Sequence, residues 1–267
     1  MSLQDRVRVR YNNPAKEEGR FGSRAQRMES RHTKLLLEEY ITPEAEVVEF
    51  GCATGHYAAH WNEKCKSYLG VELSPQQVDF FNAKGFANAT AQVGNATNCP
   101  EIADGSFDVV LCLGPMYHLD NEGQLAAMQE MARVCRPGGV LAFAYINKVG
   151  VYMHVLTGNL GGKRPWHKRT RRNRYPNRAG NEAAFTGVND EEGNPFFFTM
   201  PEEMEELAAA CGLQLVQNAG VDIVLNAQQI DHMDDEQYAC WLEFAEYMLQ
   251  WPSCTGMANH ALMICRK

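Results

Sequence analysis

The sequence predicts a single α/β domain built on a mostly parallel β-sheet, and three observations predict it. Five short apolar segments, at residues 46–50, 67–73, 89–93, 107–113 and 140–146, are separated by helix-length segments. These segments are apolar throughout rather than alternating in polarity, as strands buried on both faces of a sheet are. With 267 residues, the chain can bury a large core without disulfides or metals. We therefore expect a parallel sheet with helices on both faces.

The residues before the first strand divide into two parts. Residues 1–34 are polar and basic and have no clear hydrophobic period. Residues 33–41 then have a helical pattern, which stops at Thr42-Pro43 because proline disfavours helix in the residue before it.

Helices are also expected between the strands. Their residue preferences place them at about residues 55–66, 75–84 and 123–135. The Arg-Pro-Gly-Gly sequence at residues 136–139 ends the last of them and precedes the fifth strand.

The alternation of strands and helices breaks off after Asn147 for about fifty residues rich in Gly, Asn, Arg and Pro. A connection of that length is unusual in a compact domain unless it is functional, so we expect an insertion or cap. The elements expected beyond it are a helix from Thr199 or Met200 to about Cys211-Gly212, a strand at 213–224, a helix at 234–250 and a strand at 260–265.

The composition predicts a cytoplasmic protein. Nine cysteines are scattered without a C-x-x-C pair, which is typical of reduced, buried thiols and gives no zinc spacing. No apolar stretch approaches the length needed to cross a bilayer, and the first residues lack the apolar region of a signal peptide. We expect no metal and no membrane contact.

The charge is unevenly distributed along the chain. The net charge is −8, yet residues 163–178 hold eight Lys and Arg and no acid. A globally acidic chain disfavours non-specific binding to nucleic acid, but this basic block could create a local positive field. It is either a docking surface for RNA or protein, or a flap over a small acceptor.

A segment of small residues follows the first strand. In Glu-Phe-Gly-Cys-Ala-Thr-Gly at residues 49–55, Gly51, Ala53 and Gly55 would let a ligand lie against backbone N–H groups at a helix start. A tight turn without a ligand explains the segment equally well.

Two further features favour a nucleoside ligand. Glu72 falls at the carboxyl end of the second strand, where an acid can accept both hydroxyls of a ribose. Asn95, after the third strand, could pair with an adenine edge, although asparagine after glycine is common in turns. A nicotinamide cofactor fits less well because the G-x-G-x-x-G pattern is absent.

Together these residues resemble class I S-adenosylmethionine-dependent methyltransferases, in particular a bacterial subgroup acting on small molecules. The central glycine of the family's loop is Ala53 in this chain, which narrows the turn without forbidding binding. The resemblance rests on residues 49–55, Glu72, Asn95-Ala96, residues 106–113 and 133–139, the Leu-Gly-Pro-Met-Tyr-His-Leu run at 113–119, and Tyr11-Asn12-Asn13 followed by Arg31-His32.

The resemblance implies a Rossmann-like, seven-stranded, mostly parallel sheet with helices on both faces, an N-terminal lid and an insertion after the fifth strand. All 267 residues would form one methyltransferase domain. Its parts would be the lid (1–34), the cofactor-binding core (35–147), the insertion or cap (148–200) and the C-terminal part of the sheet (201–267).

The cofactor implied is S-adenosyl-L-methionine, lying across the carboxyl ends of the first, second and fourth strands. The binding residues implied by the resemblance are Gly51, Ala53 and Gly55 beside the methionine part, Glu49 near its amino group, Glu72 on the ribose, Leu73, Asn95 and Ala96 at the adenine, Leu113 near the sulfonium and Tyr11 above.

The chemistry requires little of the protein, because a sulfonium methyl is already activated and mainly needs a positioned acceptor. A base is needed only if the acceptor must lose a proton. His118 follows the fourth strand and titrates near neutrality, so it is the candidate base, with a structural histidine as the alternative. Tyr117 is a candidate catalytic acid or pocket wall, and Phe196-Phe197-Phe198 would line an acceptor pocket or anchor the insertion.

Three functions remain open at this point. The first is methyl transfer to a small molecule, the second is an RNA or protein methyltransferase that docks through residues 163–178, and the third is a non-catalytic cofactor-binding protein. The sequence favours the first, with nucleic acid as the less favoured partner and the oligomeric state undetermined.

Overall fold

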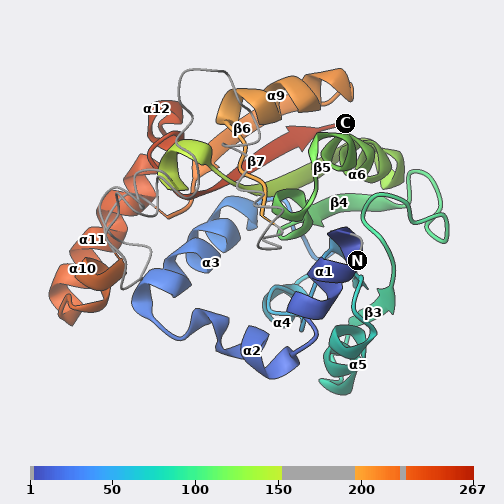
Figure 1. The fold of residues 1–267 in the computed structure, drawn as a ribbon, viewed down its shortest axis with the longest axis horizontal. Helices are drawn as coiled ribbons and strands as arrows, with labels where there is room; N and C mark the ends of the chain where they lie inside the picture. Colours follow the sequence, from blue (N-terminus) through green and yellow to red (C-terminus); the bar gives the residue numbers. More distant parts are fainter. Residues whose placement is uncertain (1–2, 152–195, 223–226) are drawn as a thin grey trace.

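The fold is described for residues 3–151, 196–222 and 227–267 of a computed structural model of the chain. Seven strands form one sheet in the order β3-β2-β1-β4-β5-β7-β6, with the first five strands parallel and β7 antiparallel to both of its neighbours (Figure 1). The predicted fold class is thus confirmed. The strands are β1 (Glu46–Phe50), β2 (Ser67–Glu72), β3 (Ala89–Val93), β4 (Phe107–Cys112), β5 (Cys135–Ile146), β6 (Gln214–Gly220) and β7 (His260–Arg266).

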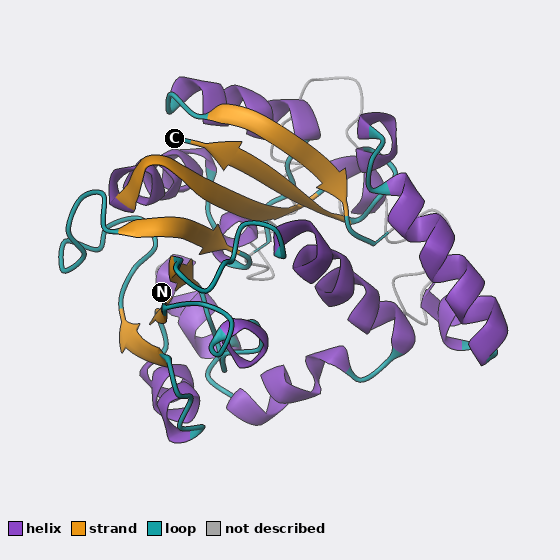
Figure 2. Ribbon diagram, turned by 180° about the vertical axis from the view of Figure 1, so that it is seen from behind, coloured by secondary structure: helices purple, strands orange, loops and turns teal. Residues whose placement is uncertain are grey.

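Helices cover both faces of the twisted sheet (Figure 2). Apolar side chains of α6 and α9 pack on one face, and those of α3, α4 and α5 pack on the other. The helices are α1 (Leu3–Arg10), α2 (Pro14–Glu18), η1 (Gly19–Phe21), α3 (Arg24–Leu37), α4 (Ala58–Trp61), α5 (Pro75–Ala83), η2 (Pro115–His118), α6 (Asn121–Val134), α9 (Pro201–Ala210), α10 (Ala227–Asp231), α11 (Asp235–Met248) and α12 (Pro252–Thr255).

The strand register brings distant residues to one edge of the sheet. Phe50 pairs with Val71 on one side and with Cys112 on the other, so the loops after β1, β2 and β4 leave the sheet together. Because β7 runs antiparallel, its first residue, His260, pairs with Ile146 at the carboxyl end of β5 and lies at the same edge. Ligands of open α/β sheets bind at this edge.

The N-terminal region is more helical than the sequence pattern predicted. Residues 33–37 of the helix expected at 33–41 are helical, but they are the end of α3, which begins at Arg24 and ends at Leu37, and α1, α2 and η1 precede it. A capping box starts α3: Ser23 accepts the N–H of Gln26 through its hydroxyl, and the Gln26 side chain accepts the N–H of Ser23. The spacing of apolar residues does not reveal where α3 begins, because the residues of the capping box are polar.

Two core boundaries also differ from the prediction. The helix expected at 55–66 is reduced to α4, four residues long. Strand β5 begins at Cys135 rather than at 140, because residues 136–139 continue the strand through an irregularity in its pairing with β4 instead of separating it from α6.

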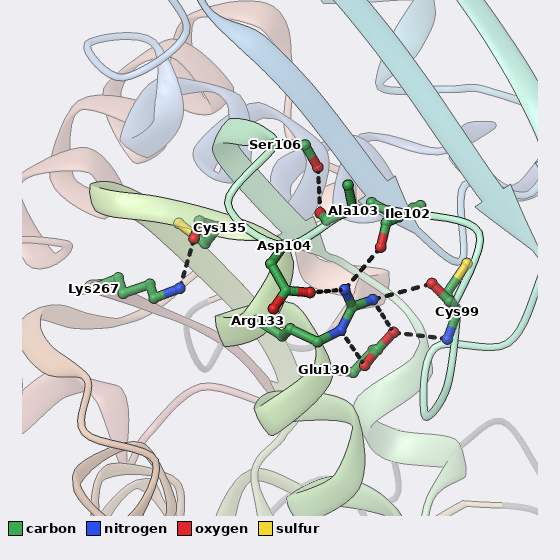
Figure 3. Close-up of polar contacts among 9 residues, drawn as sticks. All are labelled: Cys99, Ile102, Ala103, Asp104, Ser106, Glu130, Arg133, Cys135 and Lys267. Atoms are coloured by element: carbon green, nitrogen blue, oxygen red, sulfur yellow. Dashed lines mark hydrogen bonds and ion pairs between the residues drawn. The ribbon is translucent and has the colours of Figure 1, made fainter.

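Arg133 fastens the connection between β3 and β4 to helix α6 (Figure 3). Its guanidinium donates to the carbonyls of Cys99 (3.1 Å) and Ile102 (2.8 Å) and to the carboxylates of Asp104 and Glu130. Glu130 also accepts the N–H of Cys99 at 2.7 Å. These contacts hold the connection between β3 and β4 in place, although that connection contains no helix or strand.

The sequence also raised expectations about membrane-spanning helices, about the cysteines and about the basic block. In residues 3–151, 196–222 and 227–267, no helix combines the length and the apolar character that a membrane span requires. All nine cysteines are free and six of them are buried, whereas Cys240 is exposed. The basic block at 163–178, with residues 152–195 of the expected insertion, lies outside the described residues.

Candidate functional site

Two adjoining cavities lie at the carboxyl edge of the sheet. The smaller measures about 130 Å³ and is lined by the loops after β1, β2, β3 and β4 together with α1. The larger measures about 710 Å³ and extends over the ends of β5 and β7. Tyr11, Glu17, Arg20 and Tyr117 line both, so a ligand in one cavity would lie close to a ligand in the other.

The turn after β1 forms one wall of the smaller cavity. Gly51 and Ala53 line it, and both have a positive φ, of +76° and +46°, which is uncommon for alanine. Gly55 also has a positive φ but faces the ring of Phe81 rather than the cavity. The turn therefore brings backbone, rather than side chains, to the cavity wall.

Gly51→Ala is expected to destabilise the protein by about 1–3 kcal/mol. A Cβ at Gly51 would lie 2.6 Å from the ring of Pro115, in addition to the strain of its positive φ. Urea unfolding measures the loss of stability in Gly51→Ala and in a control variant, Gly212→Ala. At Gly212 φ is +73° and no atom lies within 4 Å of the added Cβ. Equal losses in the two variants would show that only the backbone strain matters.

Glu72 holds its carboxylate at the centre of the smaller cavity. One oxygen accepts the backbone N–H of Ala53 at 3.1 Å and the other accepts that of Ser74 at 3.0 Å. Burial raises the pKa of Glu72, and these N–H donors oppose the increase. Each carboxylate oxygen can accept a further hydrogen bond. The Glu72 carboxylate is therefore oriented by two backbone N–H groups at the cavity wall and keeps capacity to accept further hydrogen bonds.

Apolar and amide side chains also line the smaller cavity. Leu73 and Val71 provide apolar walls, and Asn95 and Ala96 lie beside them. The Asn95 side-chain oxygen accepts two hydrogen bonds from Thr97, at 3.1 and 3.0 Å. The oxygen is thereby fixed in place, and the amide nitrogen is left as the donor for a ligand.

Glu49 lies behind the cavity instead of lining it. Its side chain is 2 % exposed and accepts a 2.6 Å hydrogen bond from the hydroxyl of Tyr68. Burial raises the pKa of Glu49 to about 8, and the nearby Glu72 adds to the increase. Leu113 is likewise buried outside the cavity wall, so direct ligand contacts of Glu49 and Leu113 stay predictions.

Glu49→Gln is expected to flatten the pH dependence of stability. Between the ordinary glutamate pKa of 4.5 and about 8, the folded protein keeps a proton on Glu49 that the unfolded chain releases. The contribution of Glu49 to the free energy of unfolding is therefore fully present below pH 4.5 and is lost as the pH rises to about 8. Urea unfolding between about pH 5 and about pH 8 should show a shallower decline in the variant than in wild type or in Glu44→Gln, a substitution at an exposed loop residue.

His118 and Tyr11 connect the first helical region to the loop after β4. The Nε2 atom of His118 lies 2.8 Å from the Tyr11 hydroxyl, and the Gln77 side chain donates to the Tyr11 carbonyl. His118 is 7 % exposed, lines the smaller cavity and contacts the ring of Phe196, which belongs to the larger one. The candidate base thus lies where the cavities meet.

Tyr117 and the phenylalanine triplet form the apolar part of the larger cavity. Tyr117 is 4 % exposed, and its carbonyl accepts the N–H of Phe197 at 2.8 Å. Phe196 and Phe198 line the cavity on either side of this hydrogen bond. The triplet therefore both anchors the chain and contributes walls.

Sequence reasoning missed the charged residues of the larger cavity, four of which form one cluster. Arg20 pairs with Glu29 at 3.5 Å, and His260 pairs with Asp222 at 2.5 Å and with Glu29 at 4.0 Å. Burial lowers the pKa of His260, but the two carboxylates outweigh it and raise the value to about 9. No local motif signals this cluster, because its members come from four separate segments. The pairing of β7 with β5, had it been predicted, would have indicated His260.

The sequence is similar to those of known methyltransferases. Residues 48–143 match the model of a family described as a methyltransferase domain. An uncharacterized methyltransferase from Mycobacterium sp. (strain KMS) is 33% identical over 135 residues, which cover 47% of this chain and 50% of that protein. The chain thus spans about half the length of the curated relatives it matches.

Solved structures share the fold across nearly the whole chain. A chain in the complex of the Haloferax volcanii Trm112 methyltransferase activator has a TM-score of 0.61 and 16% identity, with 99% of this chain and 97% of that chain covered. A SAM-dependent methyltransferase from Archaeoglobus fulgidus has a TM-score of 0.59 and 14% identity, with 94% and 97% covered. At such identities the likeness shows the fold alone.

Proposed function

We propose that this chain, whose residues 48–143 match a methyltransferase-domain family, is a class I S-adenosylmethionine-dependent methyltransferase that transfers a methyl group to a small-molecule acceptor. The single observation that carries the proposal is the pair of adjoining cavities: one has the groups that a nucleoside needs, and the other is large enough for a second ligand.

The side chains that line the smaller cavity match the groups of the cofactor's nucleoside part. Glu72 would accept the ribose hydroxyls, Leu73 and Ala96 would contact the adenine, and Asn95 would donate to its edge. The backbone at Gly51 and Ala53 would face the methionine part. When bound, the cofactor would supply a methyl group already activated by its sulfonium charge.

The residues between the cavities would position the acceptor and exclude water. Tyr11 and Tyr117 line both cavities and Phe196 lines the larger one, so an acceptor would be enclosed by aromatic rings close to the cofactor. If the acceptor must lose a proton, the Tyr11 hydroxyl can accept it while passing its own proton to Nε2 of His118, 2.8 Å away.

The size of the larger cavity supports a small-molecule acceptor. At about 710 Å³ it falls within the range of roughly 300–1,000 Å³ found for small-molecule sites. An RNA or protein acceptor would depend on residues 163–178, which lie outside the described residues.

Label transfer in a cell extract tests the acceptor class. The protein is incubated with methyl-labelled S-adenosylmethionine and an extract, and the small metabolites, RNA and protein are then separated. Label is expected in the small-metabolite fraction. Label in RNA that disappears with rising salt, as counterion release requires, would contradict the proposal. Tight binding of the demethylated product without label in any fraction would favour the non-catalytic alternative.

A further inference from the structure

Four of the charged side chains missed by sequence reasoning form a continuous row along the larger cavity, here called the ionic row. It runs from Arg20 through Glu29 and His260 to Asp222. Arg20 lies at the end where the two cavities meet, because it lines both of them. The row therefore presents one end to the methyl-transfer region.

The carboxylates of the row are already engaged. Both oxygens of Asp222 accept hydrogen bonds from His260, one from Nδ1 at 2.5 Å and one from the backbone N–H at 2.6 Å. Glu29 lies between Arg20 and His260 and compensates both charges. The guanidinium of Arg20, in contrast, has five N–H donors and can serve a carboxylate and a ligand together. Arg20 therefore keeps N–H donors for a ligand, while Glu29 is balanced by the two cations at 3.5 and 4.0 Å.

The exposed fractions of the paired side chains also indicate that the cations face the cavity. In each ion pair the cation is more accessible than its acid: the exposed fraction is 36% for Arg20 against 14% for Glu29, and 22% for His260 against 17% for Asp222. A ligand entering the cavity would thus reach the cations first. The acids hold these cations in position from behind.

The remaining walls add positive charge and apolar surface. Arg10 and Lys16 also line the larger cavity, so four cations, counting His260, face three acids in a chain whose net charge is −8. Phe21, Met28 and Phe198 supply apolar walls between them. Such a cavity suits a molecule that is apolar over most of its surface and anionic at one end.

We infer that the acceptor is a small acid with an apolar body and that Arg20 binds its anionic group, a carboxylate or a phosphate, where the two cavities meet. This inference rests on the proposed function, since it assigns the acceptor of the same site. Its consequence is that amines of the same size are poorer acceptors than acids, because four cations face three acids in this cavity and two of those acids, Glu29 and Asp222, are already paired with Arg20 and His260.

Binding of matched probes tests the inference without a known acceptor. 3-Phenylpropanoate, 2-phenylethyl phosphate, phenethylamine and 2-phenylethanol share one phenylethyl body and differ in the polar group. Saturation-transfer NMR on protein loaded with S-adenosylhomocysteine measures the affinity of each. At least one acid is expected to bind tenfold or more tightly than the amine and the alcohol, and the two acids distinguish a carboxylate site from a phosphate site.

Three variants assign the effect to Arg20. Arg20→Gln should remove the preference for the acid, and Arg20→Lys, which keeps the charge but not the planar fork, should keep part of it. Arg8→Gln removes the same charge from an exposed residue that does not line either cavity and should leave the preference unchanged.

The outcomes separate this inference from the proposed function. Equal binding of acid and amine, tighter binding of the amine, an Arg20→Gln variant that keeps the preference, or no bound acid at all would each overturn the inference. S-adenosylhomocysteine affinity is measured on the same samples. Its absence in the wild-type protein would contradict the proposed function, whereas intact affinity without a bound acid contradicts the inference alone.

Discussion

Glu72→Ala is expected to weaken binding of S-adenosylhomocysteine roughly ten- to a hundredfold, as measured by calorimetry. Two hydrogen bonds from ribose hydroxyls to an ionised carboxylate are lost, and hydrogen bonds to charged groups contribute about 1.5–3 kcal/mol. The two backbone N–H groups that orient this carboxylate, at Ala53 and Ser74, also lose their acceptor.

Two further variants show whether the loss belongs to the ligand contact. Glu72→Gln keeps an oxygen acceptor without the charge and should lose less affinity than the alanine variant. Asp79→Ala removes an exposed acid from α5, outside the cavity, and should bind as wild type does. Unchanged affinity in Glu72→Ala, with circular dichroism showing an intact fold, would remove Glu72 from the site and weaken the cofactor assignment.

His118→Asn is expected to lower turnover by roughly a hundredfold or more for an acceptor that must lose a proton, the usual contribution of a positioned base. Cofactor affinity should not change. The substitution keeps a polar side chain that cannot accept the proton, so turnover should be lower at every pH. Steady-state kinetics over pH, with the acceptor found by label transfer, measures both effects.

The Tyr11→Phe variant tests whether His118 acts as a base or is only a structural residue. The phenylalanine ring keeps the apolar contact but cannot pass a proton to Nε2 of His118. Under the proposed route this variant should also lose turnover while His118 itself remains. Full turnover in His118→Asn would make His118 a structural residue.

The core of the fold could be predicted because its signals are local. The runs that became β1 and β3 have the expected bounds, since each is a short apolar strand between clear boundaries. Gly51, Ala53, Glu72 and Asn95 follow such strands directly. Parallel pairing then brings them to one cavity without any further information.

The larger cavity could not be predicted in this way, because it is made by tertiary contacts. Glu29 lies on a helix whose start depends on the capping box at Ser23 and Gln26, and His260 reaches the site only through antiparallel pairing with β5. Asp222 follows the edge strand β6. In the sequence these residues are single charges without a shared spacing.

The Tyr11 contacts described above have a kinetic consequence. Tyr11 lines the smaller cavity while its hydroxyl contacts His118 and its carbonyl is held by Gln77. A ligand in this cavity would therefore lie against the first helical region. If release of the spent cofactor requires that region to move, a rapid first turnover would be followed by a slower steady state.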